Sequence, residues 1–190
     1  YQFFSEKVEQ VTVVIEQNEP LGRKWATGVR YAANHFKADP LIILGSDDLL
    51  NGEYIESACR IMERQKIDFL GITEWWILDE STGIMHEMKY RNQNFALGGG
   101  RCFSQRLLQK CNFEIFDKSR NKLLDDKGNQ VAKESGLPYL ILENAHEKGL
   151  HIISIKGNWQ TLNSAEAILK STSCIQVNQF EDGNLKLKQL

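Results

Sequence analysis

The chain has 190 residues, of which 42% are apolar, and a formal net charge of -2. This length and apolar fraction predict one globular domain with a substantial core. Acidic and basic residues are interspersed, so no basic stripe predicts binding to nucleic acid. No apolar run approaches the roughly 20 residues that a membrane span needs, so no membrane span is expected.

The cysteines and the opening residues indicate a cytoplasmic protein. Cys59, Cys102, Cys111 and Cys174 are scattered along the sequence. They have neither the CxxC spacing of a zinc site nor the density of a disulfide framework, so we interpret them as reduced thiols. The first four residues lead directly into charged residues, unlike a signal peptide.

A strand and then a helix are expected near the start of the chain. The β-branched segment Val11–Ile15 predicts a short strand. Gly22 is expected to begin a helix that ends before Pro40. The apolar face of this helix repeats at helical spacing. Its residues are Trp25, Val29, Ala32 and Phe36.

The next segments predict a strand, a helix and a hairpin. Leu41–Leu44 is apolar on both faces, as in a central strand of a parallel sheet. Asn51 can cap a helix that carries Ile55, Cys59 and Met62 inward. The aromatic and β-branched run 68–78 predicts a strand, which a polar turn pairs antiparallel with 84–90. This order predicts an α/β fold with a mixed, mostly parallel sheet flanked by helices.

The second half continues the alternation. Ser104 is a plausible helix N-cap, and Leu140–Lys148 is expected to be a helix before a strand at His151–Ile155. Asn163 or Ser164 can cap a short helix through residue 169. From residue 178 the sequence lacks periodicity, so we expect a domain over residues 1–177 and an extended or loose tail over 178–190.

Two carboxylates follow the apolar strand 41–44. The run ends in Gly45-Ser46-Asp47-Asp48, and an unpaired ionised group beside a core is costly. A divalent cation relieves this cost, and Mg²⁺ or Mn²⁺ prefers such oxygen ligands. The alternative interpretation is that one of these polar residues caps the next turn.

Two further segments favour a phosphorylated ligand. Arg23 and Lys24 lie at the expected helix N-terminus, where backbone N–H groups attract anions, and Gly22 serves the turn before them. The segment Gly98-Gly99-Gly100 would let a ligand approach the backbone closely, with Arg101 beside it. These features also suit solvated basic residues and a flexible hairpin exit.

Four segments together resemble a known family. In order and spacing, residues 18–25, 44–48, 98–101 and 117–125 are similar to the nucleotide-sugar-binding half of GT-A fold glycosyltransferases, nearest to family-2-like enzymes. The resemblance covers roughly residues 8 to 170. It implies a single GT-A-like domain that lacks the first β-α unit or units, because the phosphate-side loop follows the first expected strand. Leu124 also departs from the lead-in residue typical of similar sequences.

The resemblance implies a role for each candidate residue. Asp48 would be the main ligand of Mn²⁺ or Mg²⁺, with Asp47 its neighbour. Asp125 would be the general base, with Asp126 as its substitute; either could instead cap the helix that follows. The residues implied to bind the donor and its phosphates are Gly22, Arg23, Lys24, Asp47, Gly99, Gly100 and Arg101.

The expected activity is therefore transfer of a sugar from a nucleoside-diphosphate sugar to a hydroxyl of a glycan or another acceptor. One catalytic carboxylate favours an inverting displacement. Two alternatives stay open. The first is a sugar nucleotidyltransferase, although the glycine-rich basic signature that it needs is not found near the amino end. The second is a non-catalytic relative that binds a glycan or a partner.

Overall fold

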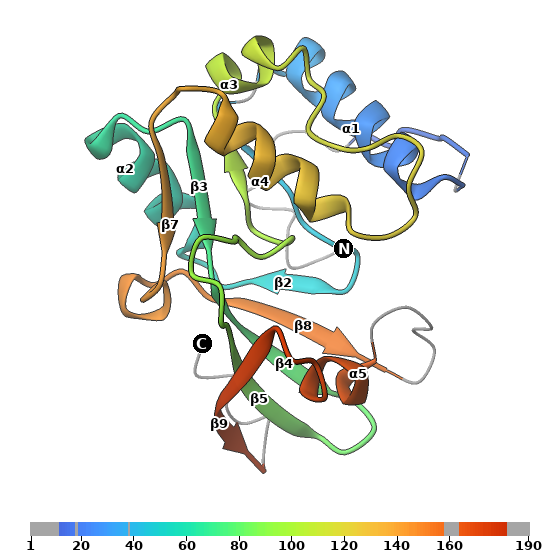
Figure 1. Cartoon of the computed structure of the whole chain (residues 1–190), viewed down its shortest axis with the longest axis vertical. Coiled ribbons are helices and arrows are strands. Elements are labelled where there is room, and N and C mark those ends of the chain that lie inside the picture. Colours follow the sequence, from blue (N-terminus) through green and yellow to red (C-terminus); the bar gives the residue numbers. More distant parts are fainter. Residues whose placement is uncertain (1–11, 18, 38, 158–163, 182–190) are drawn as a thin grey trace.

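The computed structural model describes residues 12–17, 19–37, 39–157 and 164–181. Its helices are α1 (Leu21–His35), α2 (Tyr54–Gln65), α3 (Gln105–Lys110), α4 (Leu124–Glu134), the 3₁₀ turn η1 (His146–Lys148) and α5 (Ala165–Leu169). Its strands are β1 (Leu41–Ile42), β2 (Asp48–Leu50), β3 (Phe69–Ile72), β4 (Glu74–Asp79), β5 (Ile84–Tyr90), β6 (Cys102–Phe103), β7 (Tyr139–Leu142), β8 (Ile152–Lys156) and β9 (Cys174–Phe180). The expected α/β class is confirmed, with helices on the flanks of the sheets (Figure 1).

The strands form two mixed sheets instead of one. The four-stranded sheet has the order β1-β6-β3-β7, and the five-stranded sheet has the order β2-β8-β4-β5-β9. Only the pairs β3–β7 and β4–β8 are parallel among the described strands. The expectation of a mostly parallel sheet is therefore wrong, because β6 and β5 run antiparallel to their neighbours.

Strand β3 is the centre of the four-stranded sheet and is buried on both faces. Phe69 packs into a core with residues of α1, α3 and α4. Leu70, on the opposite face, packs into a second core with residues of α2. Successive strand residues point to opposite faces, so one short apolar segment serves both cores. Figure 1 shows this division, with α2 beside β3 and β7 and with α1, α3 and α4 grouped together.

The segment expected to be a central parallel strand lies at a sheet edge. Only Leu41–Ile42 is strand, antiparallel to β6, and both residues are partly exposed. The pairing continues through the backbone of Ile43, which bonds to Arg101 and Gly100 at 2.9 and 2.7 Å. A continuous apolar run indicates burial but does not give the direction of the neighbouring strand.

The expected strand 68–78 is divided between the two sheets at Thr73. Its N–H donates to the Leu142 carbonyl at the end of β7, and its carbonyl accepts from Tyr90 N–H at the end of β5. The chain changes partners here, so β3 and β4 belong to different sheets. The expected antiparallel pairing of β4 with β5 is confirmed over six residue pairs.

Both long expected helices form, with corrections to their faces. The buried residues of α1 are Gly22, Ala26, Val29 and Ala33, whereas Phe36 is 41% exposed. The first residue of α2 is Tyr54, which is buried, and Ile55 points outward instead. Asn51 does not cap α2 with its side chain; its Oδ1 accepts from His151 N–H at 3.2 Å.

Two expected elements do not form. Residues 12–15 are not in a strand, with Val13 and Ile15 exposed, and Val11 lies outside the described residues. The helix expected at Leu140–Lys148 is instead strand β7 followed by η1. Pairing with β3 decides this conformation, because tertiary context overrides weak helical spacing.

The expected strand at His151–Ile155 forms as β8, and the expected caps of α3 and α5 are confirmed. The Ser104 hydroxyl caps α3 by accepting from Leu107 N–H at 3.0 Å, and Ser164 caps α5 in the same way. Asn163 lies outside the described residues. The expected boundary at residues 177 and 178 falls within β9, which pairs with β5. Among the described residues no helix is long and apolar enough to cross a bilayer.

Candidate functional site

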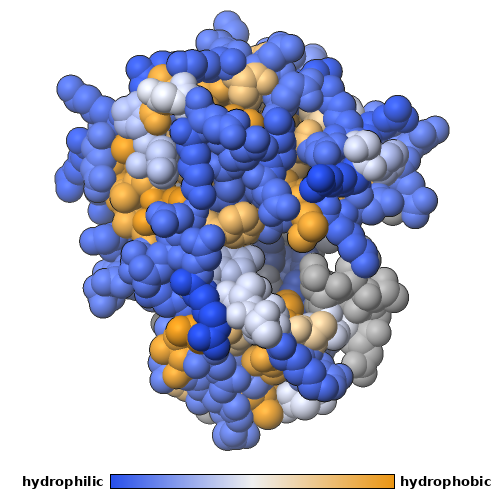
Figure 2. Space-filling model, viewed as in Figure 1, coloured by the Kyte–Doolittle hydropathy of each residue, from blue (hydrophilic) through white to orange (hydrophobic). Residues whose placement is uncertain are grey.

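A cavity of about 550 Å³ lies between the turn before β2, the glycine segment 98–99, the first turn of α4, and α5. This volume is within the roughly 300–1,000 Å³ typical of small-molecule sites. Figure 2 shows a largely hydrophilic face with a hollow between its upper and lower parts. The lining of the cavity includes Asp48 and Asp125, two of the acids predicted from the sequence.

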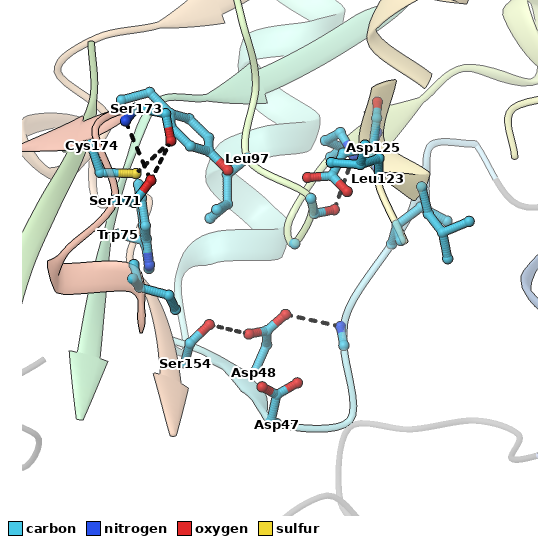
Figure 3. A pocket seen from close by; sticks show the side chains of 18 of the residues that line it. Asp47, Asp48, Trp75, Leu97, Leu123, Asp125, Ser154, Ser171, Ser173 and Cys174 are labelled. Carbon is cyan, nitrogen blue, oxygen red and sulfur yellow. Dashed lines mark hydrogen bonds between the residues drawn. The ribbon is translucent and has the colours of Figure 1, made fainter. Parts of the chain in front are cut away.

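Asp47 and Asp48 lie together at one end of the cavity. Strand β2 pairs with β8, which places Asp48 opposite Ser154. Ser154 Oγ donates to Asp48 Oδ1, and the Gly45 N–H donates to Asp48 Oδ2 at 3.0 Å (Figure 3). The Lys156 ammonium forms an ion pair with Asp47. The alternative that one of these polar residues caps a turn has support, because Asp48 closes the turn 45–48 with its N–H, which donates to the Gly45 carbonyl at 3.3 Å, and with its Oδ2.

Asp48 is an acid whose charge is costly in the folded protein. Burial raises the pKa of its carboxyl, and the negative charge of Asp47 adds to the increase. The hydrogen bond from Ser154 and the charge of Lys156 act in the opposite direction. The net direction is upward, because the cost of burying the charge outweighs these two effects.

The glycine segment runs between the two predicted functional acids. A methyl group added at Gly99 would lie 2.6 Å from Asp48 Oδ2, and one added at Gly98 would lie 3.2 Å from Asp125 Oδ2. Gly45 is equally close to Asp48 on its other side, at 2.6 Å. Because these glycines have no side chain, there is room for the Asp48 carboxylate, and the backbone can lie close to both acids.

Position 100 requires glycine for the sake of the fold. Its φ is +75°, and a Cβ there would lie 2.2 Å from the Ile152 side chain. Its carbonyl accepts from the Tyr54 hydroxyl at 2.8 Å. It is not among the described residues that line the cavity, so its place fits a backbone requirement better than donor contact.

Arg101 joins the glycine segment to α4. It is 2% exposed, and its Nε donates to the Gly98 carbonyl at 2.9 Å. Its Nη1 donates to the backbone carbonyl of Asp125 at 3.0 Å. The guanidinium also lies over the rings of Phe103 and Phe116, at 5.8 and 5.9 Å. This arrangement suits a residue that positions Asp125.

Asp125 lies in the first turn of α4 and lines the cavity, on a different side from Asp48 (Figure 3). The N-cap residue of α4 is Leu123, with φ of 55° and no side-chain cap bond. The alternative that Asp125 or Asp126 caps this helix is therefore wrong. Asp126 faces a neighbouring cavity, so Asp125 is the better placed of the two.

The basic turn at the start of α1 is not at this cavity. Gly22 packs against another loop: a Cβ there would lie 1.9 Å from the Asp117 carbonyl oxygen, and its N–H donates to Arg120 O at 2.9 Å. Arg23 and Lys24 are exposed and are not among the described residues of the cavity lining. Of residues 19–25, only Trp25, which the sequence assigned to the apolar face of the helix, is among the described residues that line the cavity.

Ser154 and Lys156 are site residues that were not predicted from the sequence. Both line the cavity and contact the acid pair from β8. The available signal was their spacing: two polar residues two positions apart, on one face of an otherwise apolar strand.

The acid pair fits one mode of divalent-cation binding. Among the described residues no group of three or more His, Cys, Asp or Glu side chains could hold a metal ion. An all-protein cage is therefore not formed by these residues. Mg²⁺, however, is commonly held by one or two carboxylates together with waters and substrate phosphates. Asp47 and Asp48, with the Ser154 hydroxyl nearby, suit that second mode.

In comparisons with known proteins, no family model and no curated protein matches this chain.

Proposed function

We propose that the protein is a metal-dependent glycosyltransferase with a GT-A-like arrangement, which moves a sugar from a nucleoside-diphosphate sugar to an acceptor hydroxyl. The observation that carries this proposal is one cavity that joins the acid pair, the glycine segment and Asp125. The free thiols of all four cysteines suit the expected cytoplasmic location.

Each part of the site has a task in this reaction. Asp47 and Asp48 would hold Mn²⁺ or Mg²⁺, which when bound stabilises negative charge on a departing nucleoside diphosphate. Gly98 and Gly99 let the donor sugar approach the backbone, because they present no side chain. Asp125, oriented through its backbone by Arg101, accepts the proton of the acceptor hydroxyl. A single base of this kind supports an inverting outcome.

The first test is a thermal-shift screen of nucleoside diphosphates and their sugars, with Mn²⁺ or with EDTA. A ligand that binds only the folded state raises the melting temperature. We expect one nucleotide to stabilise the wild type in Mn²⁺ but not in EDTA, and not to stabilise Asp48→Asn in either condition. An equal increase in melting temperature in Mn²⁺ and in EDTA, for both wild type and Asp48→Asn, would contradict the proposal.

The second test separates catalysis from binding. Asp125→Asn keeps the size of the side chain and is expected to keep the metal-dependent donor shift while transfer falls by about 10²–10⁴-fold. If this variant transferred sugar at the wild-type rate, Asp125 would not be the general base. Donor binding by the wild type without transfer to any glycan or other hydroxyl would favour the non-catalytic relative. Formation of a sugar nucleotide from a nucleoside triphosphate would favour the nucleotidyltransferase.

A further inference from the structure

Lys156 is a buried cation beside the predicted metal ligands. The residue is 8% exposed, and its ammonium forms an ion pair with Asp47 Oδ2. The position is fixed by the backbone: Ile155 N–H donates to the Asp47 carbonyl at 2.8 Å, which extends the pairing of β8 with β2. Lys156 therefore meets the acid pair because of strand register, not through a chance surface contact.

The charges of this group are not balanced by Lys156 alone. Asp47 and Asp48 carry two negative charges, and Lys156 supplies one positive charge. A divalent cation at the pair would bring the local charge from -1 to +1. It would also bind the Asp47 carboxylate, whose Oδ2 the ammonium contacts, so the two cations compete for one carboxylate.

The lysine has a second place to bind. Its ammonium carries three donors and lies on a flexible stem, so it can turn from one acceptor to another without moving the strand. Lys156 lines the same cavity as Asp47, Asp48 and Ser154, so a diphosphate bound there to a cation on the acids would lie within the cavity that Lys156 lines. A diphosphate in that position offers several anionic acceptors to the ammonium.

We propose that Lys156 is an exchangeable counter-ion of the donor site. It pairs with Asp47 in the free protein, leaves Asp47 when a divalent cation binds, and then donates to the diphosphate of the donor. This inference rests on the proposed function, because it assigns Lys156 a role toward the same metal and donor. It makes the binding of metal and donor depend on a residue of β8.

The inference predicts effects of opposite sign for one substitution. Lys156→Gln removes the competing ammonium, so the affinity for Mn²⁺ alone should increase by about five- to tenfold. The same change removes a charged donor to the phosphates, so the affinity for a nucleoside diphosphate in saturating Mn²⁺ should fall by about tenfold or more. If the ion pair were purely structural, its loss would weaken the affinity for Mn²⁺ and the affinity for the nucleoside diphosphate.

Isothermal titration measures both affinities. Mn²⁺ is titrated first without nucleotide, and the nucleoside diphosphate found by the thermal-shift screen is then titrated at saturating Mn²⁺. Arg60→Gln is the matched control, because it removes one positive charge from an exposed pair with Glu56 on α2. We expect it to leave both affinities unchanged. Equal affinities in Lys156→Gln and wild type, or a loss of both, would overturn the inference.

A measurement on the wild type covers the case in which Lys156→Gln does not fold. The ¹⁵N signal of the Lys156 ammonium, assigned with Lys156→Arg, reports its hydrogen-bonded partner. We expect one shift when Mg²⁺ is added and a second when the nucleoside diphosphate follows. A signal that stays constant while wild type binds both ligands overturns this inference alone. Wild type that binds neither ligand overturns the proposed function together with it.

Discussion

Replacing Gly99 by alanine tests the geometry on which the site depends. The added Cβ would lie 2.6 Å from Asp48 Oδ2, whereas ordinary contacts begin at 3.4 Å. The carboxylate would have to retreat by about 0.8 Å, which disturbs its hydrogen bonds with Gly45 and Ser154. Gly99 does not have a positive φ, so backbone strain does not add to the effect.

The cost to folding should be modest and the cost to metal binding large. Overpacking costs about 1–3 kcal/mol, and the lower end applies here because a side-chain tip must move. That corresponds to about 2–4 °C in melting temperature per kcal/mol for a chain of this size. Disturbing the groups that orient a metal ligand costs about 10–100-fold in metal affinity.

Differential scanning fluorimetry and Mn²⁺ titration measure these two effects in one preparation. Gly28→Ala is the control, because Gly28 lies inside α1 with nothing within 4 Å of an added Cβ. We expect it to gain about 0.5–1 kcal/mol of stability and to keep the affinity for Mn²⁺. Wild-type Mn²⁺ affinity in Gly99→Ala would show that metal binding does not depend on the position of the Asp48 carboxylate.

Three further predictions concern residues around the site and the cores. Gly22→Ala should cost about 3 kcal/mol in urea unfolding, because its Cβ meets the Asp117 carbonyl at 1.9 Å; a stable variant with weaker donor binding would instead favour a donor contact. Arg101→Met should cost about 2–4 kcal/mol, because the partly buried carbonyls of Gly98 and Asp125 each lose a charged donor, and should lower kcat more than it raises KM; equal changes in both would contradict a positioning role. The hydrogen bond from Arg106 lowers the pKa of Asp68 below its usual 3.8. The ionised Asp68 carboxylate therefore adds its full contribution to the free energy of unfolding above the unfolded-state pKa. This contribution is lost as the pH falls through the folded-state pKa. Urea unfolding from pH 6 to pH 2 should therefore show a steeper loss in the wild type than in Asp68→Asn, and parallel curves would contradict it.

The sequence alone predicts elements whose signals are local. The hairpin of β4 and β5 and the caps at Ser104 and Ser164 depend on residues a few positions apart, and all three form as expected. The direction of Leu41–Ile42 and the strand at Tyr139–Leu142 depend on distant partners, β6 and β3. Periodicity carries no information about such partners, so both predictions fail.

The same distinction between local signals and distant partners applies to the residues of the site. Asp48 and Asp125 could be selected from the sequence, because each is an acid next to a recognisable change of structure. Lys156 could not be linked to Asp47, because 109 residues separate them and only the register of β2 and β8 brings them together. Arg101 could be selected as a cation, but its burial between two aromatic rings is a consequence of packing.

A crystal soaked with Mn²⁺ and the nucleoside diphosphate would show whether Asp47 and Asp48 hold a metal ion. Anomalous scattering locates Mn²⁺ without any assumption about the ligands. We expect one strong peak within about 2.0–2.3 Å of an Asp48 carboxylate oxygen, bridged to the diphosphate. Ordered nucleotide elsewhere on the molecule, or Mn²⁺ bound away from Asp47 and Asp48, would contradict it.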